Sequence, residues 1–341
     1  MKFFGIEENY FKIKLDRPLK NSKRRYVNRE GFFITLSLDT YKGLGEVAPL
    51  PGFSTESLDE SLWAIEQLKK TLKKGSNYKS KELFELFKLF TNDTPCLNFA
   101  LDIALCDILS QIKKVPIGQH INKNFLNKIN FSSMNKSSIK ENNIIKVKFG
   151  IDDIKSEINH LKKIQSNLPN NVCYRVDANN AYNVKDAIYL LNELKEFNVE
   201  YVEEPLSNMS IDNLKKIKKI SSLNIALDES IIANNYKELI SSGLIKYVIF
   251  KASLFGSIEK IQKLNQYLVS HDVNLVLSSA LHSPIGNMSN IHVASFLELN
   301  NKHGLNNFMF YDYTKGSVPY KNNSTFVDLS SIIGLGVNLD N

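Results

Sequence analysis

The stretch Ile144-Ile145-Lys146-Val147-Lys148 is an apolar run that ends in charged residues, and four later runs end in the same way. They are Tyr174-Arg175-Val176-Asp177, Tyr201-Val202-Glu203, Ile225-Ala226-Leu227-Asp228 and Val248-Ile249-Phe250-Lys251. The charged ends at 148, 177, 203, 228 and 251 lie 29, 26, 25 and 23 residues apart, and each step has room for a strand, a helix and a return. The pattern predicts successive parallel strands with ionisable groups at corresponding ends.

Helical periodicity fills each interval between these strands. The expected helices cover residues 152–167, 184–198, 210–221, 234–242 and 257–271. Alternation of strands and helices is typical of a parallel sheet, and so many repeats in one direction favour closure into a barrel. Further strands of this α/β barrel are expected at Ile129–Ser133, Asn274–Ser278 and Asn307–Tyr311.

The first part of the chain has a different order, because its strands come before its helices. Strands are expected at 3–15, 31–37 and 44–48, and helices at Ser57–Lys74, Ser80–Phe90 and Thr94–Ile112. The chain also exceeds the ~250 residues of a bare barrel. We therefore predict an α+β domain at 1–112, a β/α barrel at 113–315, and a C-terminal segment at 316–341 that packs back on the first domain.

Composition excludes several classes of function. The chain has 341 residues, 43% hydrophobic residues and a formal charge of +7, but its lysines are interleaved with acids and form no basic stripe. Nucleic-acid binding is therefore not expected, whereas a small anionic substrate is compatible with the charge. Cys96, Cys106 and Cys173 have no metal-ligand spacing. Without a signal peptide or a run of ~20 apolar residues, we expect a cytoplasmic protein with no membrane insertion, compatible with a homo-oligomer.

Lys146 and Lys148 are two residues apart on a strand, so their side chains point to the same face. Mutual repulsion and a nearby dication would lower the pKa of at least one ammonium group, as in lysines that act as bases. The alternative is a pair of surface lysines on an edge strand. The apolar neighbours Ile144, Ile145 and Phe149 argue against that alternative.

Asp177, Glu203 and Asp228 end three consecutive strands, so their carboxylates can converge above the barrel. Three unpaired carboxylates would repel one another, and a divalent cation relieves that repulsion. Oxygen ligands favour Mg²⁺, with Mn²⁺ compatible, over zinc. The alternative is that each acid only caps the helix after its strand. Asn179 is expected on the same side as Asp177, and Glu204 on the side away from the metal.

Lys251 ends a strand on the opposite side of the predicted ring from Lys148. A substrate held above a metal would therefore meet one lysine on each face. This arrangement suits removal of a proton alpha to a carboxylate, because the metal stabilises the enediolate. The same groups could return the proton or expel a leaving group.

The whole set of motifs resembles the enolase superfamily, in its muconate-lactonizing subgroup, which pairs lysine or histidine bases with Mg²⁺. The matching residues are Lys146-x-Lys148, Asp177-Ala-Asn179, Glu203-Glu204-Pro205, Asp228-Glu229-Ser230 and Lys251. Within the subgroup the likeness is strongest to the o-succinylbenzoate synthases, through Gly45–Ser54, Leu277–Ala280 and Arg29–Gly31. The resemblance implies a modified TIM-type (β/α)7β barrel with an α+β N-terminal capping domain.

The resemblance also implies a reaction, the Mg²⁺-dependent syn-dehydration of 2-succinyl-6-hydroxy-2,4-cyclohexadiene-1-carboxylate to o-succinylbenzoate in menaquinone biosynthesis. Lys148 would remove the alpha proton, Lys251 would stabilise the enolate, and Lys146 would contact the substrate carboxylate. Further expected substrate contacts are Asn179, Ser54, Ser279 and Phe53.

Other activities remain open at this stage. An N-acylamino acid racemase or dipeptide epimerase would use the same two lysines, a muconate cycloisomerase is a less favoured enzyme, and a catalytically silent binding protein is a third class. Two features depart from the resemblance. The segment Gly304–Asn307 lacks an expected acid, and His282 is interpreted as an ordinary loop histidine without a paired acid.

Overall fold

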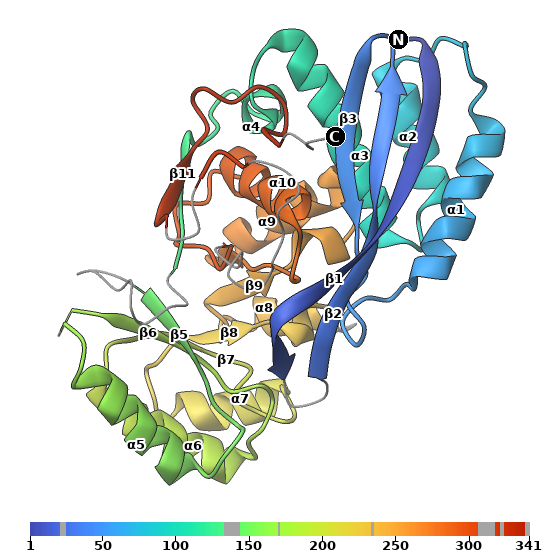
Figure 1. Cartoon of the computed structure of the whole chain (residues 1–341). Helices are drawn as coiled ribbons and strands as arrows, with labels where there is room; N and C mark the ends of the chain where they lie inside the picture. Colours follow the sequence, from blue (N-terminus) through green and yellow to red (C-terminus); the bar gives the residue numbers. More distant parts are fainter. Residues whose placement is uncertain are drawn as a thin grey trace.

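An antiparallel sheet opens the fold in the computed structural model, which describes residues 1–20, 25–132, 144–169, 171–232, 235–305, 318–320 and 324–337. Its strands are β1 (Phe3–Lys20), β2 (Arg25–Leu38) and β3 (Tyr41–Val47), in that order across the sheet. β1 and β2 are longer than the expected strands at 3–15 and 31–37. These strands and the three helices that follow form one unit beside the rest of the chain (Figure 1).

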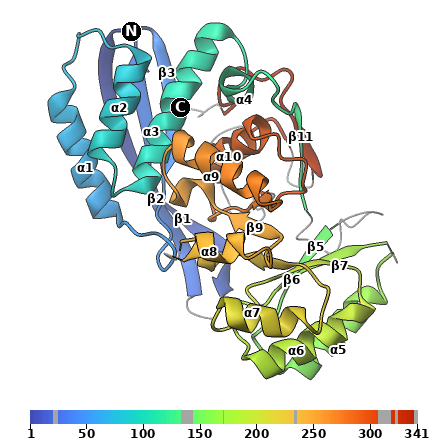
Figure 2. The same cartoon turned by 180° about the vertical axis from the view of Figure 1, so that it is seen from behind.

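The helices of this unit are α1 (Leu58–Thr71), α2 (Ser80–Phe90) and α3 (Pro95–Lys113), close to their expected positions. α3 packs directly on β3, since a Cβ atom added to Gly43 would lie 1.9 Å from the carbonyl oxygen of Ala104. Any larger residue there would force the helix away from the sheet. Seen from behind, α3 lies between the sheet and the remainder of the molecule (Figure 2).

α3 is long and apolar enough to cross a membrane by length and composition, which the sequence analysis did not expect. However, 78% of its apolar window is buried inside the fold, as in the core helix of a soluble protein. Its residues contribute to two hydrophobic cores, with Leu101 on the side of the N-terminal sheet and Ile103 on the other side. A cytoplasmic location stays a prediction.

The second half of the chain forms a curled parallel sheet in which every strand lies next to its neighbour in sequence. Its strands, in order, are β5 (Ile144–Lys148), β6 (Cys173–Asp177), β7 (Val199–Glu203), β8 (Ile225–Leu227), β9 (Tyr247–Phe250) and β10 (Asn274–Leu277). This arrangement confirms the predicted fold class, an α/β barrel of TIM type with an α+β N-terminal unit.

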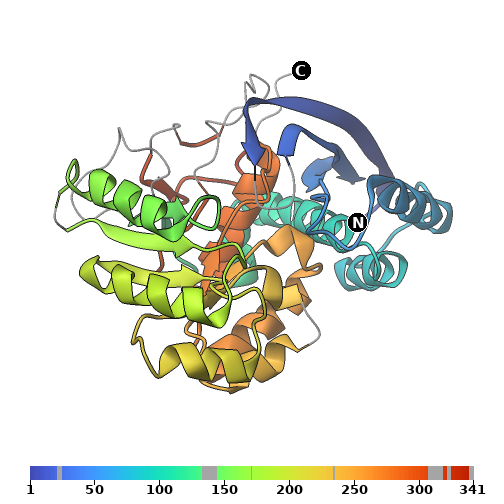
Figure 3. The same cartoon turned by 90° about the horizontal axis from the view of Figure 1, so that it is seen from below.

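Helices connect these strands and lie on the outer side of the sheet, as the view from below shows (Figure 3). They are α5 (Ile154–Gln165), α6 (Val184–Glu193), α7 (Ile211–Lys218), α8 (Tyr236–Ser241) and α9 (Ile258–Ser270), with short 3₁₀ helices η2 (Leu194–Glu196), η3 (Glu229–Ile232) and η4 (Ala252–Leu254). Each α-helix lies within or close to one of the predicted helical intervals.

Strand β4 (Lys128–Asn130) overlaps the first barrel strand expected at Ile129–Ser133, and it also pairs in antiparallel fashion with β11 (Phe326–Asp328), which was not predicted. Bridge pairs join Phe131 to His303 and Ser278 to Gly304. The expected strand at Asn307–Tyr311 lies outside the described residues.

Two helices were not predicted from the sequence, α4 (Ile117–Ile121) and α10 (Pro284–Phe296). α10 is buried along its whole length and begins with a proline in its first turn. It contacts β3, β4, α4 and η4, so it lies at the seam between the N-terminal unit and the barrel.

The described part of the C-terminal segment contacts α3 through one buried carboxylate. Asp107 accepts a hydrogen bond from the backbone nitrogen of Leu335 at 2.8 Å and another from that of Leu44 at 3.1 Å. Strand β3, helix α3 and the C-terminal segment therefore meet at Asp107. The domain boundaries near residues 112 and 315 stay a prediction.

A second buried acid on α3 predicts how stability depends on pH. Asp102 accepts from the backbone nitrogen of Ile258 at the start of α9, and burial raises its pKa to about 7. Since the folded chain keeps a proton that the unfolded chain releases above pH ~4, the free energy of unfolding should fall between pH ~4 and ~7.

The substitution Asp102→Asn should remove a few kcal/mol of this decrease in the free energy of unfolding, because each unit of pKa shift contributes about 1.4 kcal/mol. Urea unfolding of both proteins at a series of pH values measures the effect. Asp93→Asn, at an exposed position, is the matched control and should leave the slope unchanged. A parallel pair of curves for wild type and Asp102→Asn would contradict the prediction.

Candidate active site

The register of the parallel sheet brings the charged strand ends to one edge. Lys148 pairs with Asp177 across β5 and β6, and Asp177 pairs with Glu203 across β6 and β7. Asp228 directly follows β8, and Lys251 directly follows β9. The five predicted groups therefore follow one another along the C-terminal edge, with Lys148 and Lys251 near its two ends.

Lys146 lies between two of the predicted metal ligands. Its Nζ atom is 2.9 Å from Asp177 Oδ2 and 2.5 Å from Glu203 Oε2. Lys148, two residues further on, is exposed. The resemblance implied that Lys146 contacts the substrate carboxylate, and that role stays a prediction; in this structure its ammonium group lies on the two acids.

The charges at this point are strongly coupled. Burial raises the pKa of Glu203 to about 8, against the lowering effect of Lys146. Burial would also raise the pKa of Asp177, but the charges of Lys146 and Lys148 hold it below its usual value. Burial would lower the pKa of Lys146, and the surrounding carboxylates raise it well above the usual value. Lys146 is therefore charged and paired with both acids in this structure.

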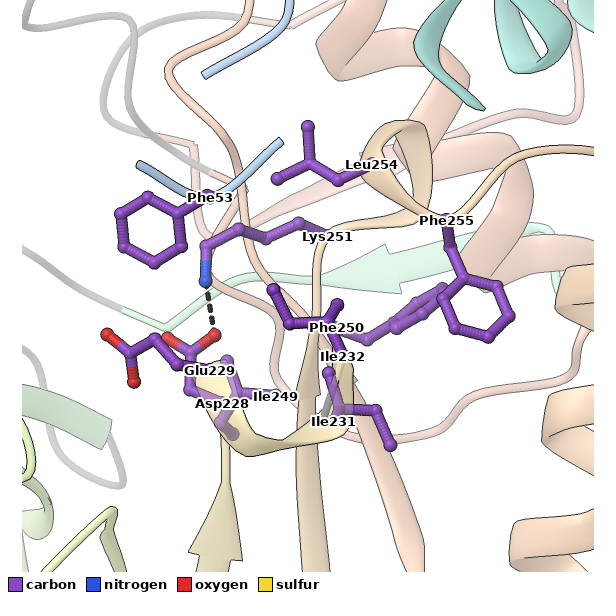
Figure 4. Close-up of a pocket in the computed structure, with 10 residues that line it drawn as sticks. All are labelled: Phe53, Asp228, Glu229, Ile231, Ile232, Ile249, Phe250, Lys251, Leu254 and Phe255. Atoms are coloured by element: carbon purple, nitrogen blue, oxygen red, sulfur yellow. Dashed lines mark hydrogen bonds and ion pairs between the residues drawn. The ribbon is translucent and has the colours of Figure 1, made fainter. Parts of the chain in front are cut away.

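Lys251 pairs with Asp228 on the other side of the site (Figure 4). The ring of Phe53, from the loop after β3, lies over this lysine with its centroid 4.9 Å from Nζ. A pocket beside the pair is lined mainly by apolar side chains, including Ile231, Leu254 and Phe255. One lysine thus lies between a carboxylate and an aromatic ring in apolar surroundings.

The predicted metal ligands do not meet at one point. Among the described residues, no three His, Cys, Asp or Glu side chains are placed to hold a metal ion. Asp177 and Glu203 meet at Lys146, and Asp228 meets Lys251. The donor set still fits a hard divalent cation, because Asp177, Glu203 and Asp228 offer only carboxylate oxygens.

Glu204 points away from the site, as expected from the alternation along β7. Its carboxylate accepts hydrogen bonds from the backbone nitrogens of Asp228 at 2.7 Å and Ser230 at 2.9 Å, and from the Ser230 hydroxyl. It thereby ties the end of β7 to the end of β8. Asn179 has a φ of 51°, and its amide nitrogen donates to the carbonyl oxygens of Phe149 and Asp177, so it shapes the turn after β6.

The other predicted substrate contacts, Ser54 and Ser279, form hydrogen bonds within their own loops. The Ser54 hydroxyl accepts from the backbone nitrogen of Leu50 at 2.7 Å, and the Ser279 hydroxyl accepts from that of His282 at 3.1 Å. Their roles toward a substrate stay predictions. Phe53 differs from them, because its ring lies against Lys251.

His282 lies in a loop, as predicted, but the expectation that it has no acid partner was wrong. His282 is buried, and its Nδ1 atom lies 2.8 Å from Oε1 of Glu46, which is 236 residues away in the sequence. Glu46 belongs to β3, in the quoted stretch Gly45–Ser54. Sequence reasoning missed this pair because no local pattern links such distant residues.

Arg29 forms a second link across the same seam. Its Nε atom donates to the carbonyl oxygen of Ala280 after β10, at 3.2 Å. Its Nη1 atom donates to that of Pro49 at 2.6 Å, and Nη2 donates to that of Ala48. One guanidinium group therefore holds the loop after β3 against the end of β10.

Comparison with known proteins identifies the class. Residues 136–341 match the family model "Enolase C-terminal domain-like", and residues 8–108 match "MenC, N-terminal domain". With this fold and these strand-end residues, the chain belongs to the enolase superfamily. Members of this class are enzymes that bind Mg²⁺ and act on small carboxylates.

Individual relatives divide between two activities. A hydrophobic dipeptide epimerase of Enterococcus faecalis is 24% identical over 86% of this chain and 87% of the relative. An o-succinylbenzoate synthase of Desulfotalea psychrophila is 24% identical over 83% of this chain and 88% of the relative. A crystal structure of the E. faecalis dipeptide epimerase, complexed with Mg and the dipeptide L-Leu-L-Tyr, superposes with a TM-score of 0.85 at 21% identity and covers 99% of each chain.

Proposed function

We propose that this enzyme is an o-succinylbenzoate synthase, which dehydrates 2-succinyl-6-hydroxy-2,4-cyclohexadiene-1-carboxylate. The observation that carries the proposal is the match of residues 8–108 to the MenC N-terminal domain, since this unit contains the loop that places Phe53 on Lys251. The barrel residues alone are shared with epimerases. The N-terminal unit is the part that favours the synthase.

Asp177, Glu203 and Asp228 would hold Mg²⁺, with Mn²⁺ as a compatible substitute. The ion would supply positive charge against the two oxygens of the substrate carboxylate when that group becomes an enediolate. The support for this assignment is the oxygen-only donor set, together with the Mg present in the related dipeptide epimerase.

The lysines at the two ends of the edge would handle the proton and the charge. Lys148, which is exposed at the end of β5, accepts the alpha proton, and the electrons of the broken C–H bond move into the carboxylate. Lys251 faces the opposite side and stabilises the negative charge. The hydroxyl group then departs as water with the proton from Lys148, and the ring becomes aromatic.

The second candidate is a dipeptide epimerase. It is favoured by the E. faecalis relative, which matches over a similar share of this chain at the same identity as the synthase. In that reaction one lysine removes the alpha proton and the other returns a proton to the opposite face. The two candidates therefore differ in the substrate and share the lysines.

One assay separates them. Purified enzyme with Mg²⁺ is given the cyclohexadiene substrate, or the hydrophobic dipeptide L-Leu-L-Tyr, in D₂O, and the products are followed by NMR. We expect formation of o-succinylbenzoate with kcat/KM of about 10⁴ M⁻¹s⁻¹ or higher, and far slower deuterium exchange at the dipeptide alpha carbon. Rapid deuterium exchange at the dipeptide alpha carbon, without dehydration of the cyclohexadiene substrate, would show that the enzyme is an epimerase and not a synthase.

A further inference from the structure

A chain of three buried polar groups crosses the seam between the N-terminal unit and the barrel. His282 Nδ1 lies 2.8 Å from Glu46 Oε1, and His282 Nε2 lies 2.8 Å from the Ser253 hydroxyl. The exposed fractions of Glu46, His282 and Ser253 are 3%, 1% and 2%. We call these residues the Glu46–His282–Ser253 chain. They belong to β3, the loop after β10, and η4.

The partners of Glu46 fix the direction of the hydrogen bonds. Its carboxylate also accepts from the backbone nitrogens of Ser283 at 3.0 Å and Gly286 at 3.1 Å. Burial would raise the pKa of Glu46, but His282 and Ser283 hold it below the usual value. An ionised carboxylate only accepts, so His282 donates from Nδ1 to Glu46, and Nε2 is left for the Ser253 hydroxyl.

The imidazole ring has one fixed position. The backbone nitrogen of His282 donates to the Ser279 hydroxyl at 3.1 Å. A Cβ atom added to Gly286 would lie 2.7 Å from His282 Nδ1, so the first turn of α10 packs tightly on the ring. A ring held by two hydrogen bonds, by a third hydrogen bond from its own backbone nitrogen, and by packing transmits a displacement of one neighbour to the others.

This connectivity matches that of a serine hydrolase triad, but burial excludes the same use. A nucleophilic serine must meet its substrate, and Ser253 is 2% exposed. The chain lies instead beside the predicted active site. Ser253 is two residues after Lys251, and the backbone nitrogen of Leu254 donates to the carbonyl oxygen of Lys251 at 3.0 Å. Fixing Ser253 therefore fixes the turn from which Lys251 extends.

We propose that His282 is a positioning residue. Through its hydrogen bonds to Glu46 and Ser253, it couples the position of β3 to the position of Lys251. The same strand continues into the loop that carries Phe53, whose ring lies over Lys251. The N-terminal unit thus reaches this lysine twice, once through Phe53 and once through the Glu46–His282–Ser253 chain. The inference rests on the proposed function only in that Lys251 acts in catalysis.

Two isosteric substitutions divide the contacts of His282. His282→Asn keeps an amide near the position of Nδ1 and retains the bond to Glu46, whereas His282→Gln keeps an amide near the position of Nε2 and retains the bond to Ser253. We expect His282→Asn and Ser253→Ala to lower kcat by about 10-fold with little change in KM, and His282→Gln to lie within about 3-fold of wild type. His160→Asn, at an exposed position on α5, is the control.

The double variant His282→Asn/Ser253→Ala should be no slower than either single variant, because both remove the same link. The proposal would be overturned if His282→Gln and His282→Asn lowered kcat equally. It would also be overturned if the loss of kcat in each variant only followed the drop in its thermal midpoint.

Hydrogen exchange supplies a readout that is independent of substrate. The amides of Leu254 and Phe255 should exchange faster in His282→Asn and Ser253→Ala than in His282→Gln. If wild type is inert on both substrates, the proposed function fails, and the exchange rates still decide the role of His282. Equal exchange in all variants would show that His282 does not hold this turn.

Discussion

Lys148→Ala is expected to lower kcat by about 10²–10⁴-fold, because it removes the proposed proton acceptor at the end of β5. The thermal midpoint should change little, since Lys148 is exposed and surface substitutions usually alter stability by about 0.5 kcal/mol or less. Lys148→Arg should be almost as slow, because a guanidinium group keeps the charge but does not release its proton at neutral pH. Steady-state kinetics on the cyclohexadiene substrate measures both effects.

Lys155→Ala, which changes an exposed lysine on α5, is the matched control and should keep wild-type kinetics. If Lys148→Arg retained activity while Lys148→Ala lost it, the lysine would act through its charge rather than as a base. If the chain is an epimerase instead, Lys148→Ala should stop deuterium exchange from one dipeptide isomer and spare exchange from the other.

Glu203→Gln is expected to abolish activity and most of the stabilisation by Mg²⁺. A ligand that binds only the folded state stabilises it by about 2.7 kcal/mol at 100 times its Kd, and the loss of one of three carboxylates should raise that Kd strongly. Thermal midpoints with and without Mg²⁺ give this readout without any substrate. In the absence of Mg²⁺ the variant should remain folded, because burial already disfavours the charged form of Glu203.

Glu196→Gln, an exposed position in η2, controls for the loss of one negative charge. It should respond to Mg²⁺ as wild type does. An unchanged Mg²⁺ response in Glu203→Gln would remove this residue from the proposed ligand set, and the same response in Asp177→Asn and Asp228→Asn would remove the site altogether.

The barrel was predictable because each parallel strand is a short apolar run with a charged end, and each connecting helix has one apolar face. α10 was missed for the opposite reason. It is buried on all sides, so it lacks the alternation between apolar and polar faces that reveals a surface helix. The helix period was present for α5 and α9 and absent for this one.

The site was predictable only as far as strand register determines it. Alternation at the end of β7 indicated that Glu203 and Glu204 point to different sides, and their partners differ accordingly, whereas the shared face of Lys146 and Lys148 on β5 stays a prediction. It gave no indication that the ammonium group of Lys146 would lie between Asp177 and Glu203, because that depends on distances across strands. The pairing of Glu46 with His282 was equally out of reach, since 236 residues separate the two.

The hydrogen bonds of Asp107 have a consequence for the order in which the chain folds during synthesis. The residue that satisfies one of its oxygens, Leu335, follows it by 228 positions. A nascent chain that has only completed α3 already offers Gln111 and Leu44 as donors to this carboxylate, but it lacks the donor from Leu335. The face of α3 around Asp107 should therefore reach its full set of hydrogen bonds only after the C-terminal segment around Leu335 has left the ribosome.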